Sequence, residues 1–106
     1  MTNSINIVGR ITKDPQSRQA GEYTVVSFSV ACDNKGKDKG TTFFDCQAWG
    51  KQGEFVMNYL GKGRLVYVQG QMESRKHEDK TYWTVTANEV KGLDRPRDDN
   101  QEESFA

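Results

Sequence analysis

The chain has 106 residues, of which 34% are hydrophobic and 28% are charged. This length fits a single domain with one modest core. Its two cysteines, Cys32 and Cys46, are too few for a disulfide framework and lack metal-ligand spacing, so we expect reduced core thiols. No apolar run is long enough to cross a bilayer, and the first residues do not form a signal peptide. We therefore expect a cytoplasmic protein that does not associate with membranes.

The formal net charge is zero, but the charges are unevenly distributed. All fifteen Lys and Arg residues lie at or before Arg97, whereas four of the fifteen acidic residues follow it. Residues 1–97 therefore carry a net charge of +4, and residues 98–106 carry −4. The basic body can attract phosphate, and the acidic tail can compete for the same surface or recruit a basic partner. Alternatively, the tail only keeps the protein soluble.

The hydrophobic pattern predicts an all-β chain with one short helix. Residues 5–11 alternate between apolar and polar side chains, as a strand does, and Asp14-Pro15 ends this strand because proline has no backbone N–H. Similar patterns predict further strands at residues 23–32, 42–51, 65–76 and 82–90. Five strands with one helix between the third and the fourth are typical of a five-stranded OB-fold barrel.

The predicted helix covers residues 52–60 and ends at a glycine-rich signal, Gly61-Lys62-Gly63. The residues expected on its packing face recur at i, i+1, i+4 and i+5: Phe55, Val56, Tyr59 and Leu60. Gly9 and Gly70 lie inside predicted strands, where we expect the bulges that let a small barrel bend.

The third predicted strand has one unusual face. Its inward side is small and apolar, with Phe44, Cys46 and Ala48. Its outward side combines two large rings with polar residues: Phe43, Asp45, Gln47 and Trp49. Flat rings among hydrogen-bonding groups suit the stacking of unpaired nucleic-acid bases, because every base has a π-face. An ordinary half-buried strand with one exposed ring is the alternative.

A loop without apolar residues, residues 33–40, precedes this strand. Its three lysines and two glycines predict a mobile basic hairpin tip, in which Lys35 and Lys37 are candidate phosphate contacts. Such a tip could close over a phosphate backbone, or it could be a plain solvated loop.

From Asn3 to Val90 the chain resembles the bacterial and phage single-stranded DNA-binding (SSB) proteins. The resemblance rests on several motifs in the same order: Ile7-Val8-Gly9-Arg10 through Asp14-Pro15, Phe28-Ser29-Val30-Ala31, Phe43-Phe44 through Trp49-Gly50-Lys51, Tyr59-Leu60-Gly61-Lys62-Gly63 and Val66-Tyr67-Val68-Gln69-Gly70-Gln71. It implies an OB-fold that binds and protects single-stranded DNA without sequence preference, in replication, recombination and repair. It also implies a homo-oligomer, most often of four chains, with no catalytic residues, cofactor or metal.

The resemblance assigns roles to particular residues. The family's stacking rings correspond to Phe43, Trp49 and His77, whereas Gly36 lies where a further ring is missing. Trp83 is an additional ring, which we expect at the core rim because it shares parity with Val85 and Ala87. Phosphates are expected to contact basic side chains, namely Arg10, Lys13, Lys35, Lys37, Lys51, Lys62, Arg75 and Lys76.

The C-terminal segment is expected to be separate from the folded domain. Residues 1–92 form the expected DNA-binding and oligomerisation domain, and residues 93–106 form a flexible acidic tail. Family tails dock on replication or repair proteins, and the corresponding residues here are Asp98, Asp99, Glu102, Glu103 and Phe105. This tail departs from the family pattern because it lacks a proline and does not end at its aromatic residue.

Rival functions make different predictions. One His, no Ser/His/Asp set and no glycine-rich phosphate loop argue against an enzyme. An OB-fold adaptor that binds protein or structured RNA would bind poly(dT) weakly. A structural β-domain without a ligand would explain neither the aromatic face nor the uneven charge.

Overall fold

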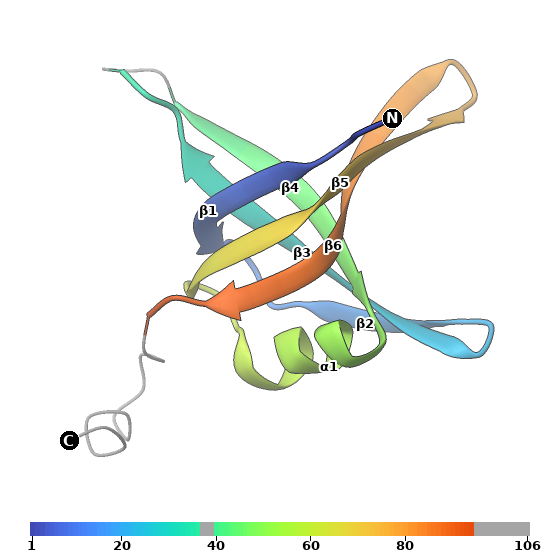
Figure 1. Ribbon diagram of the computed structural model, residues 1–106, viewed down its shortest axis with the longest axis horizontal. Coiled ribbons are helices and arrows are strands. Elements are labelled where there is room, and N and C mark those ends of the chain that lie inside the picture. Colours follow the sequence, from blue (N-terminus) through green and yellow to red (C-terminus); the bar gives the residue numbers. More distant parts are fainter. Residues whose placement is uncertain (37–39, 95–106) are drawn as a thin grey trace.

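The computed structural model describes residues 1–36 and 40–94 of the chain. Its elements, in chain order, are β1 (Ile5–Ile11), β2 (Gln16–Ala20), β3 (Tyr23–Asp33), β4 (Thr41–Trp49), α1 (Gly50–Tyr59), β5 (Leu65–His77) and β6 (Lys80–Gly92) (Figure 1). The predicted all-β organisation, with one short helix between the aromatic strand and the next long strand, is confirmed.

Five of the strands close into a ring. The order β1-β5-β6-β4-β3 returns to β1 through a short β1–β3 pairing at Arg10 and Ile11. All pairings are antiparallel except β4–β6, which is parallel and joins Cys46 to Val85 and Gln47 to Thr86. The ring contains the five strands that the sequence pattern predicted.

β2 is a sixth strand that the sequence pattern did not predict. It pairs only with β3, at the outer edge of the sheet. Its sequence, Gln16-Ser17-Arg18-Gln19-Ala20, has no apolar alternation, and its first four residues are exposed. Hydrophobic periodicity cannot reveal such a strand, because neither of its faces is buried in the core.

The core fills the inside of the ring. Alternate residues of each ring strand point inward, and the central members are buried: Ile7, Ile11, Phe28, Val30, Cys46, Ala48, Val66, Val68 and Val85. The helix α1 closes one end of the ring, on the side opposite to the projecting β5–β6 hairpin (Figure 1). No helix in the described part of the chain combines the length and the apolar character needed to span a membrane.

The packing face of α1 is narrower than predicted. Val56 and Leu60 are buried, as expected. Phe55 and Tyr59 are instead 36% and 65% exposed, with their ring centroids 5.5 Å apart, so their predicted packing on the sheet is wrong. A ten-residue helix over the end of a small ring buries only one i, i+4 pair, and the neighbouring i, i+4 pair faces outward.

Two glycines allow close backbone approach inside the ring. The β5–β6 register shifts between Gln69 and Gly70, where an irregularity was predicted, but the extra residue is Asn88, so β6 and not β5 carries the bulge. A Cβ at Gly70 would collide with the carbonyl oxygen of Thr86. Gly9 has no bulge, because it remains in register with β5, so that prediction is wrong. A Cβ at Gly9 would instead collide with the carbonyl oxygen of Ala31, where β1 meets β3.

Candidate nucleic-acid interface

The two faces of β4 have the predicted opposite characters. Cys46 and Ala48 are 2% and 0% exposed and point into the core. Phe43 and Trp49 point outward, with 62% and 40% of their surfaces exposed. β4 therefore presents two flat rings to solvent, with the polar residues of the same face between them.

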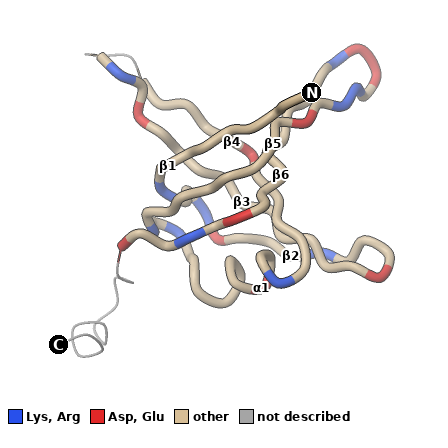
Figure 2. Tube along the Cα trace, viewed as in Figure 1, with Lys and Arg blue, Asp and Glu red and all other residues tan. Residues whose placement is uncertain are grey.

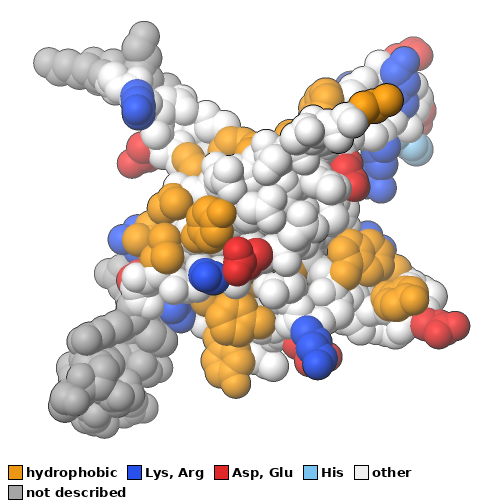
Figure 3. Space-filling model, in the orientation of Figure 1, with side chains coloured by type: hydrophobic (Ala, Val, Ile, Leu, Met, Phe, Trp, Pro, Cys, Tyr) orange, Lys and Arg blue, Asp and Glu red, His pale blue; other side chains and the backbone are white. Residues whose placement is uncertain are grey.

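Trp49 is positioned by the junction between β4 and α1. It is the N-cap residue of the helix and has an extended backbone, and Gly50 follows with a positive φ that turns the chain. Its ring meets Tyr23 edge to face, with centroids 6.4 Å apart. Exposed apolar side chains lie on the β2–β3 hairpin close to its turn, where β3 begins (Figure 3). The contact with Tyr23 restricts the orientation of the Trp49 indole and leaves part of the ring exposed to solvent.

A polar groove of about 300 Å³ runs along the outer face of β4. Asp45 and Gln47 of β4 lie on its floor, next to the Ser27 and Ser29 side of β3. Its walls come from the β1–β2 loop, from β2 and from the β5–β6 hairpin: Lys13, Asp14, Gln16, Arg18, Arg75 and Thr84. We call this cleft the β4 groove. It combines three cationic side chains, two carboxylates and neutral hydrogen-bonding groups, with one more positive than negative charge.

The β4 groove continues onto the β5–β6 hairpin. Gln47, Arg75 and Thr84 also line an adjoining hollow, and Arg75 lines a further one with Lys76, His77 and Tyr82. Arg75 is directly opposite Tyr82 in the hairpin, so a guanidinium and a phenol ring share one face. The His77 side chain is 74% exposed, and its Nε2 lies 3.5 Å from the Glu78 carboxylate.

The sequence analysis missed two candidate DNA contacts, Arg18 in the β4 groove and Tyr82 in its continuation on the hairpin. Arg18 lies on the unpredicted strand β2, so no pattern placed it near β4. Tyr82 is 45% exposed and lies across from Arg75. Tyr82 alternates along β6 with Thr84 and Thr86 and so shares their outward face. This alternation could have identified Tyr82 as an exposed ring.

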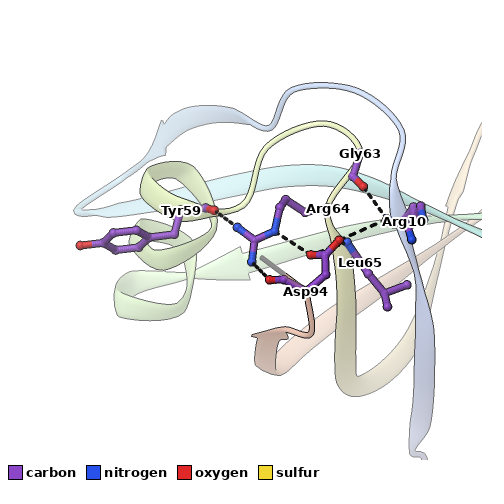
Figure 4. Close-up of polar contacts among 6 residues, drawn as sticks. All are labelled: Arg10, Tyr59, Gly63, Arg64, Leu65 and Asp94. Atoms are coloured by element: carbon purple, nitrogen blue, oxygen red, sulfur yellow. Dashed lines mark hydrogen bonds and ion pairs between the residues drawn. The ribbon is translucent and has the colours of Figure 1, made fainter. Parts of the chain in front are cut away.

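Arg10 belongs to a different cluster. Its Nη1 donates to the Gly63 carbonyl oxygen at 2.9 Å and to the Asp94 carboxylate at 3.2 Å (Figure 4). It also lines a separate cavity with Phe43, between β1, β3 and β4. Arg10 is therefore near one of the predicted stacking rings, but its charge is already paired with Asp94.

Asp94 links the end of β6 to the rest of the domain. Its Oδ1 accepts from Arg64 Nε at 2.9 Å and from the Leu65 N–H at 3.2 Å. Arg64 also donates to the backbone oxygens of Asp94 and Tyr59, at 2.7 and 2.8 Å (Figure 4). Burial alone would raise the pKa of the Asp94 carboxyl, but the hydrogen bonds from Arg64, Leu65 and Arg10 outweigh it and hold the pKa below its usual value.

The remaining predicted cations are dispersed. Lys13 lines the β4 groove, and Lys76 lies on the hairpin. Lys35 is exposed beyond the end of β3, and Lys51 and Lys62 are exposed at the two ends of the α1 region. None of these three lysines lines the β4 groove. Lys37 and the tail residues lie outside the described residues: Asp98, Asp99, Glu102, Glu103 and Phe105.

Cys46 is a core thiol as predicted, whereas Cys32 is only partly buried, at the edge of the core. Cys46 is buried, and burial, with smaller effects of Asp45 and Cys32, raises the pKa of its thiol to about 12. Burial, followed by the charge of Asp33, also raises the pKa of Cys32, whose Sγ donates to the Val8 carbonyl oxygen at 3.2 Å. Over residues 1–36 and 40–94, no three His, Cys, Asp or Glu side chains are grouped so that they could hold a metal ion.

The sequence of residues 2–93 matches the model of the single-strand binding protein family. The chain belongs to this family. Its members have the OB-fold, which confirms the predicted fold and the resemblance, and they are DNA-binding proteins rather than enzymes.

Individual relatives support the same assignment. Single-stranded DNA-binding protein 2 of Clostridium acetobutylicum is 36% identical over 111 aligned positions, covering 94% of this chain and 83% of the relative. Single-stranded DNA-binding protein A of Bacillus subtilis is 34% identical, covering 85% of this chain and 55% of the relative. A single-stranded DNA-binding protein of Staphylococcus epidermidis is 39% identical, covering 74% of this chain and 63% of the relative. The chain thus spans only a little more than half of the length of the B. subtilis relative.

Proposed function

We propose that this protein binds single-stranded DNA with little sequence preference and protects it during replication, recombination and repair. The observation that carries the proposal is the outer face of β4, where Phe43 and Trp49 flank a groove lined by cations and hydrogen-bonding groups. Family membership and the names of the relatives support the same function.

Bases would stack on the exposed rings. Phe43, Trp49 and His77 are the proposed stacking residues, and Tyr82 extends this set on the hairpin. Stacking of a base on an aromatic side chain contributes about 1–3 kcal/mol and tolerates any sequence. Duplex DNA would bind much less well, because its bases are already stacked and turned inward.

Phosphates would be contacted by Lys and Arg side chains, with release of counterions. Lys13, Arg18, Arg75 and Lys76 line the β4 groove or its continuation and are the strongest candidates. Lys35, Lys37, Lys51 and Lys62 would contact a strand that extends beyond the groove. Arg10 lies near Phe43, but its guanidinium is bonded to Asp94, so it would contact a phosphate only while still paired with that carboxylate.

The proposed function is tested by titrating oligo(dT) and a duplex of the same length at low and high salt. We expect saturable binding of oligo(dT) that weakens with salt, and much weaker binding of the duplex. An OB-fold adaptor for protein or structured RNA would instead leave oligo(dT) almost unbound at both salt concentrations.

We also propose a homo-oligomer, with four chains as the expected number. Along β1 and residues 65–71 of β5, Arg10 is the single charged residue (Figure 2). Tyr67 and Gln69 of β5 bond to Asn6 and Ser4, at 2.9 and 3.2 Å, and Val8 is 54% exposed. A surface with few charges and an exposed apolar side chain has the composition of the core of a protein–protein interface. If it is an interface, Val8→Glu should lower the mass measured by sedimentation; an unchanged mass would contradict this assignment.

The tail and the cellular location complete the proposal. Residues 1–92 would bind DNA and oligomerise, and residues 93–106 would serve as an acidic tail. Through Asp98, Asp99, Glu102, Glu103 and Phe105, that tail could recruit replication or repair proteins. A protein with this function would work in the cytoplasm, on the nucleoid or on phage DNA.

A further inference from the structure

Trp83 lies on the part of the β5–β6 hairpin that projects past the ring (Figure 1). It is 56% exposed, although Val85 and Ala87, on the same side of β6, are 1% and 7% exposed. The predicted position at the core rim is therefore wrong. The reason is that β1 pairs with β5 only as far as Gly70, and β4 pairs with β6 only as far as Val85. Beyond these pairs, no strand among the described residues covers Trp83.

The neighbours of Trp83 leave its ring open and add a positive charge. Ser74 lies directly opposite Trp83. Lys76 is two residues further along β5, opposite Thr81, and so lies on the same face of the hairpin as Ser74 and Trp83. Diagonal neighbours of this kind lie about 7–8 Å apart, within reach of long side chains. Within residues 1–36 and 40–94, Trp83 makes no ring–ring contact, unlike Trp49, which contacts Tyr23.

The opposite face of the hairpin belongs to the proposed DNA site. Arg75, His77 and Tyr82 lie there and line the continuation of the β4 groove. Lys76, which strand alternation places on the Trp83 face, also lines this hollow. The projecting hairpin therefore carries rings and cations on both faces. On this face the exposed indole of Trp83 offers a flat ring on which a base can stack.

We propose that Trp83 is an additional base-stacking site for single-stranded DNA, with Lys76 contacting a neighbouring phosphate. Successive nucleotides would then contact both faces of the hairpin. This inference rests on the proposed function, because it assumes that a DNA strand follows the β4 groove to the hairpin. A second copy of this chain is the other candidate to cover Trp83, and the experiment distinguishes the two.

The first measurement uses the two tryptophans of the chain. In Trp49→Phe, Trp83 is the only tryptophan, so its fluorescence reports directly on this site. We expect quenching when oligo(dT) is added. Emission that is unchanged by saturating oligo(dT), with binding verified by anisotropy of a labelled strand, would overturn the inference.

The second measurement compares Trp83→Thr with Tyr59→Thr, a matched control on the exposed face of α1 at the other end of the molecule. Loss of one stacking contact should raise the Kd for labelled oligo(dT) by about 5-fold to 150-fold in Trp83→Thr. Tyr59→Thr should bind as the original protein does.

The outcomes separate the two proposals. If the original protein binds oligo(dT) and Trp83→Thr binds equally well, the inference about Trp83 fails and the proposed function stands. If the original protein does not bind, the proposed function itself fails. A third outcome is that Trp83→Thr has a lower mass by sedimentation but an unchanged affinity per chain. This would mean that a second copy covers Trp83, and it would also overturn the inference.

Discussion

Phe43 and Trp49 lie at opposite ends of the same exposed face of β4, six positions apart. At about 3.3 Å per residue, this places their Cα atoms about 20 Å from one another. Asp45 and Gln47 lie between them, on the floor of the β4 groove. Two bases stacked on these rings would therefore not be adjacent in the strand, and the nucleotides between them would pass over the polar groove.

Replacing either ring should weaken DNA binding without unfolding the domain. Phe43→Ala and Trp49→Ala each remove one stacking platform, so we expect a loss of about 1–3 kcal/mol in binding to oligo(dT). Both rings are substantially exposed, and the core behind them is unchanged. Anisotropy of a labelled strand measures the affinity, and urea unfolding verifies the stability. Phe55→Ala, which removes an exposed ring on α1, is the control; full affinity in both β4 variants would refute the stacking assignment.

The salt dependence should identify the phosphate contacts. Arg75 lines three adjoining hollows of the groove, so Arg75→Gln should reduce the slope of log K against log salt concentration by about 0.7, the value for one phosphate of a single strand. Lys91→Gln is the control, because Lys91 lies on β6 away from the groove, with its Nζ 3.5 Å from Glu89. An equal slope in Arg75→Gln and the original protein would exclude a phosphate contact at Arg75.

The Asp94 cluster should contribute to stability. In Asp94→Asn the hydrogen bonds to Arg64 and Arg10 lose their negative partner, and the Arg64 side chain is only 11% exposed. We expect a decrease of about 1–3 kcal/mol in the free energy of unfolding at pH 7, measured by urea denaturation.

The pH dependence of this effect has a definite sign. The pKa of Asp94 is lower in the folded state than its usual value of 3.8. Its carboxylate therefore stabilises the fold fully above that usual value, and the contribution is lost as the pH falls through the lower folded pKa. The difference between Asp94→Asn and the original protein should shrink below about pH 4. A difference that stays constant down to pH 2 would contradict the ionic role of Asp94.

The buried thiol should be unreactive in the native protein. Because burial raises the pKa of Cys46 to about 12, almost no thiolate is present at pH 8. In Cys32→Ser, which leaves Cys46 as the only cysteine, iodoacetamide should label the protein only in denaturant, as measured by mass spectrometry. The denatured sample is the positive control. Rapid labelling of the native variant would show that Cys46 is not a closed core position.

Much of the fold could be predicted because side-chain alternation and burial coincide in the ring. The two faces of β4 are an example: small apolar residues point inward and the rings point outward. Gly70 is another, because a glycine inside a long strand indicates a close backbone approach, and Gly70 lies against the Thr86 carbonyl where the β5–β6 register shifts. Both features follow from local sequence alone.

Other features depend on contacts between distant residues. β2 is stabilised by pairing with β3 and has no buried face of its own, so its sequence carries no strand pattern. Trp83 has the parity of a core residue, but the hairpin extends beyond the core at that position. The pairing of Arg10 with Asp94 joins residues 84 positions apart, and no sequence motif indicates it.

Binding to single-stranded DNA is the central claim, and one titration tests it most directly. A labelled oligo(dT) and a labelled duplex of equal length are titrated with the protein, and anisotropy is measured at low and high salt. The proposed function predicts tight, saturable binding of oligo(dT), weaker binding at high salt and much weaker binding of the duplex. No binding of oligo(dT) at low salt, or equal binding of the duplex, would contradict it.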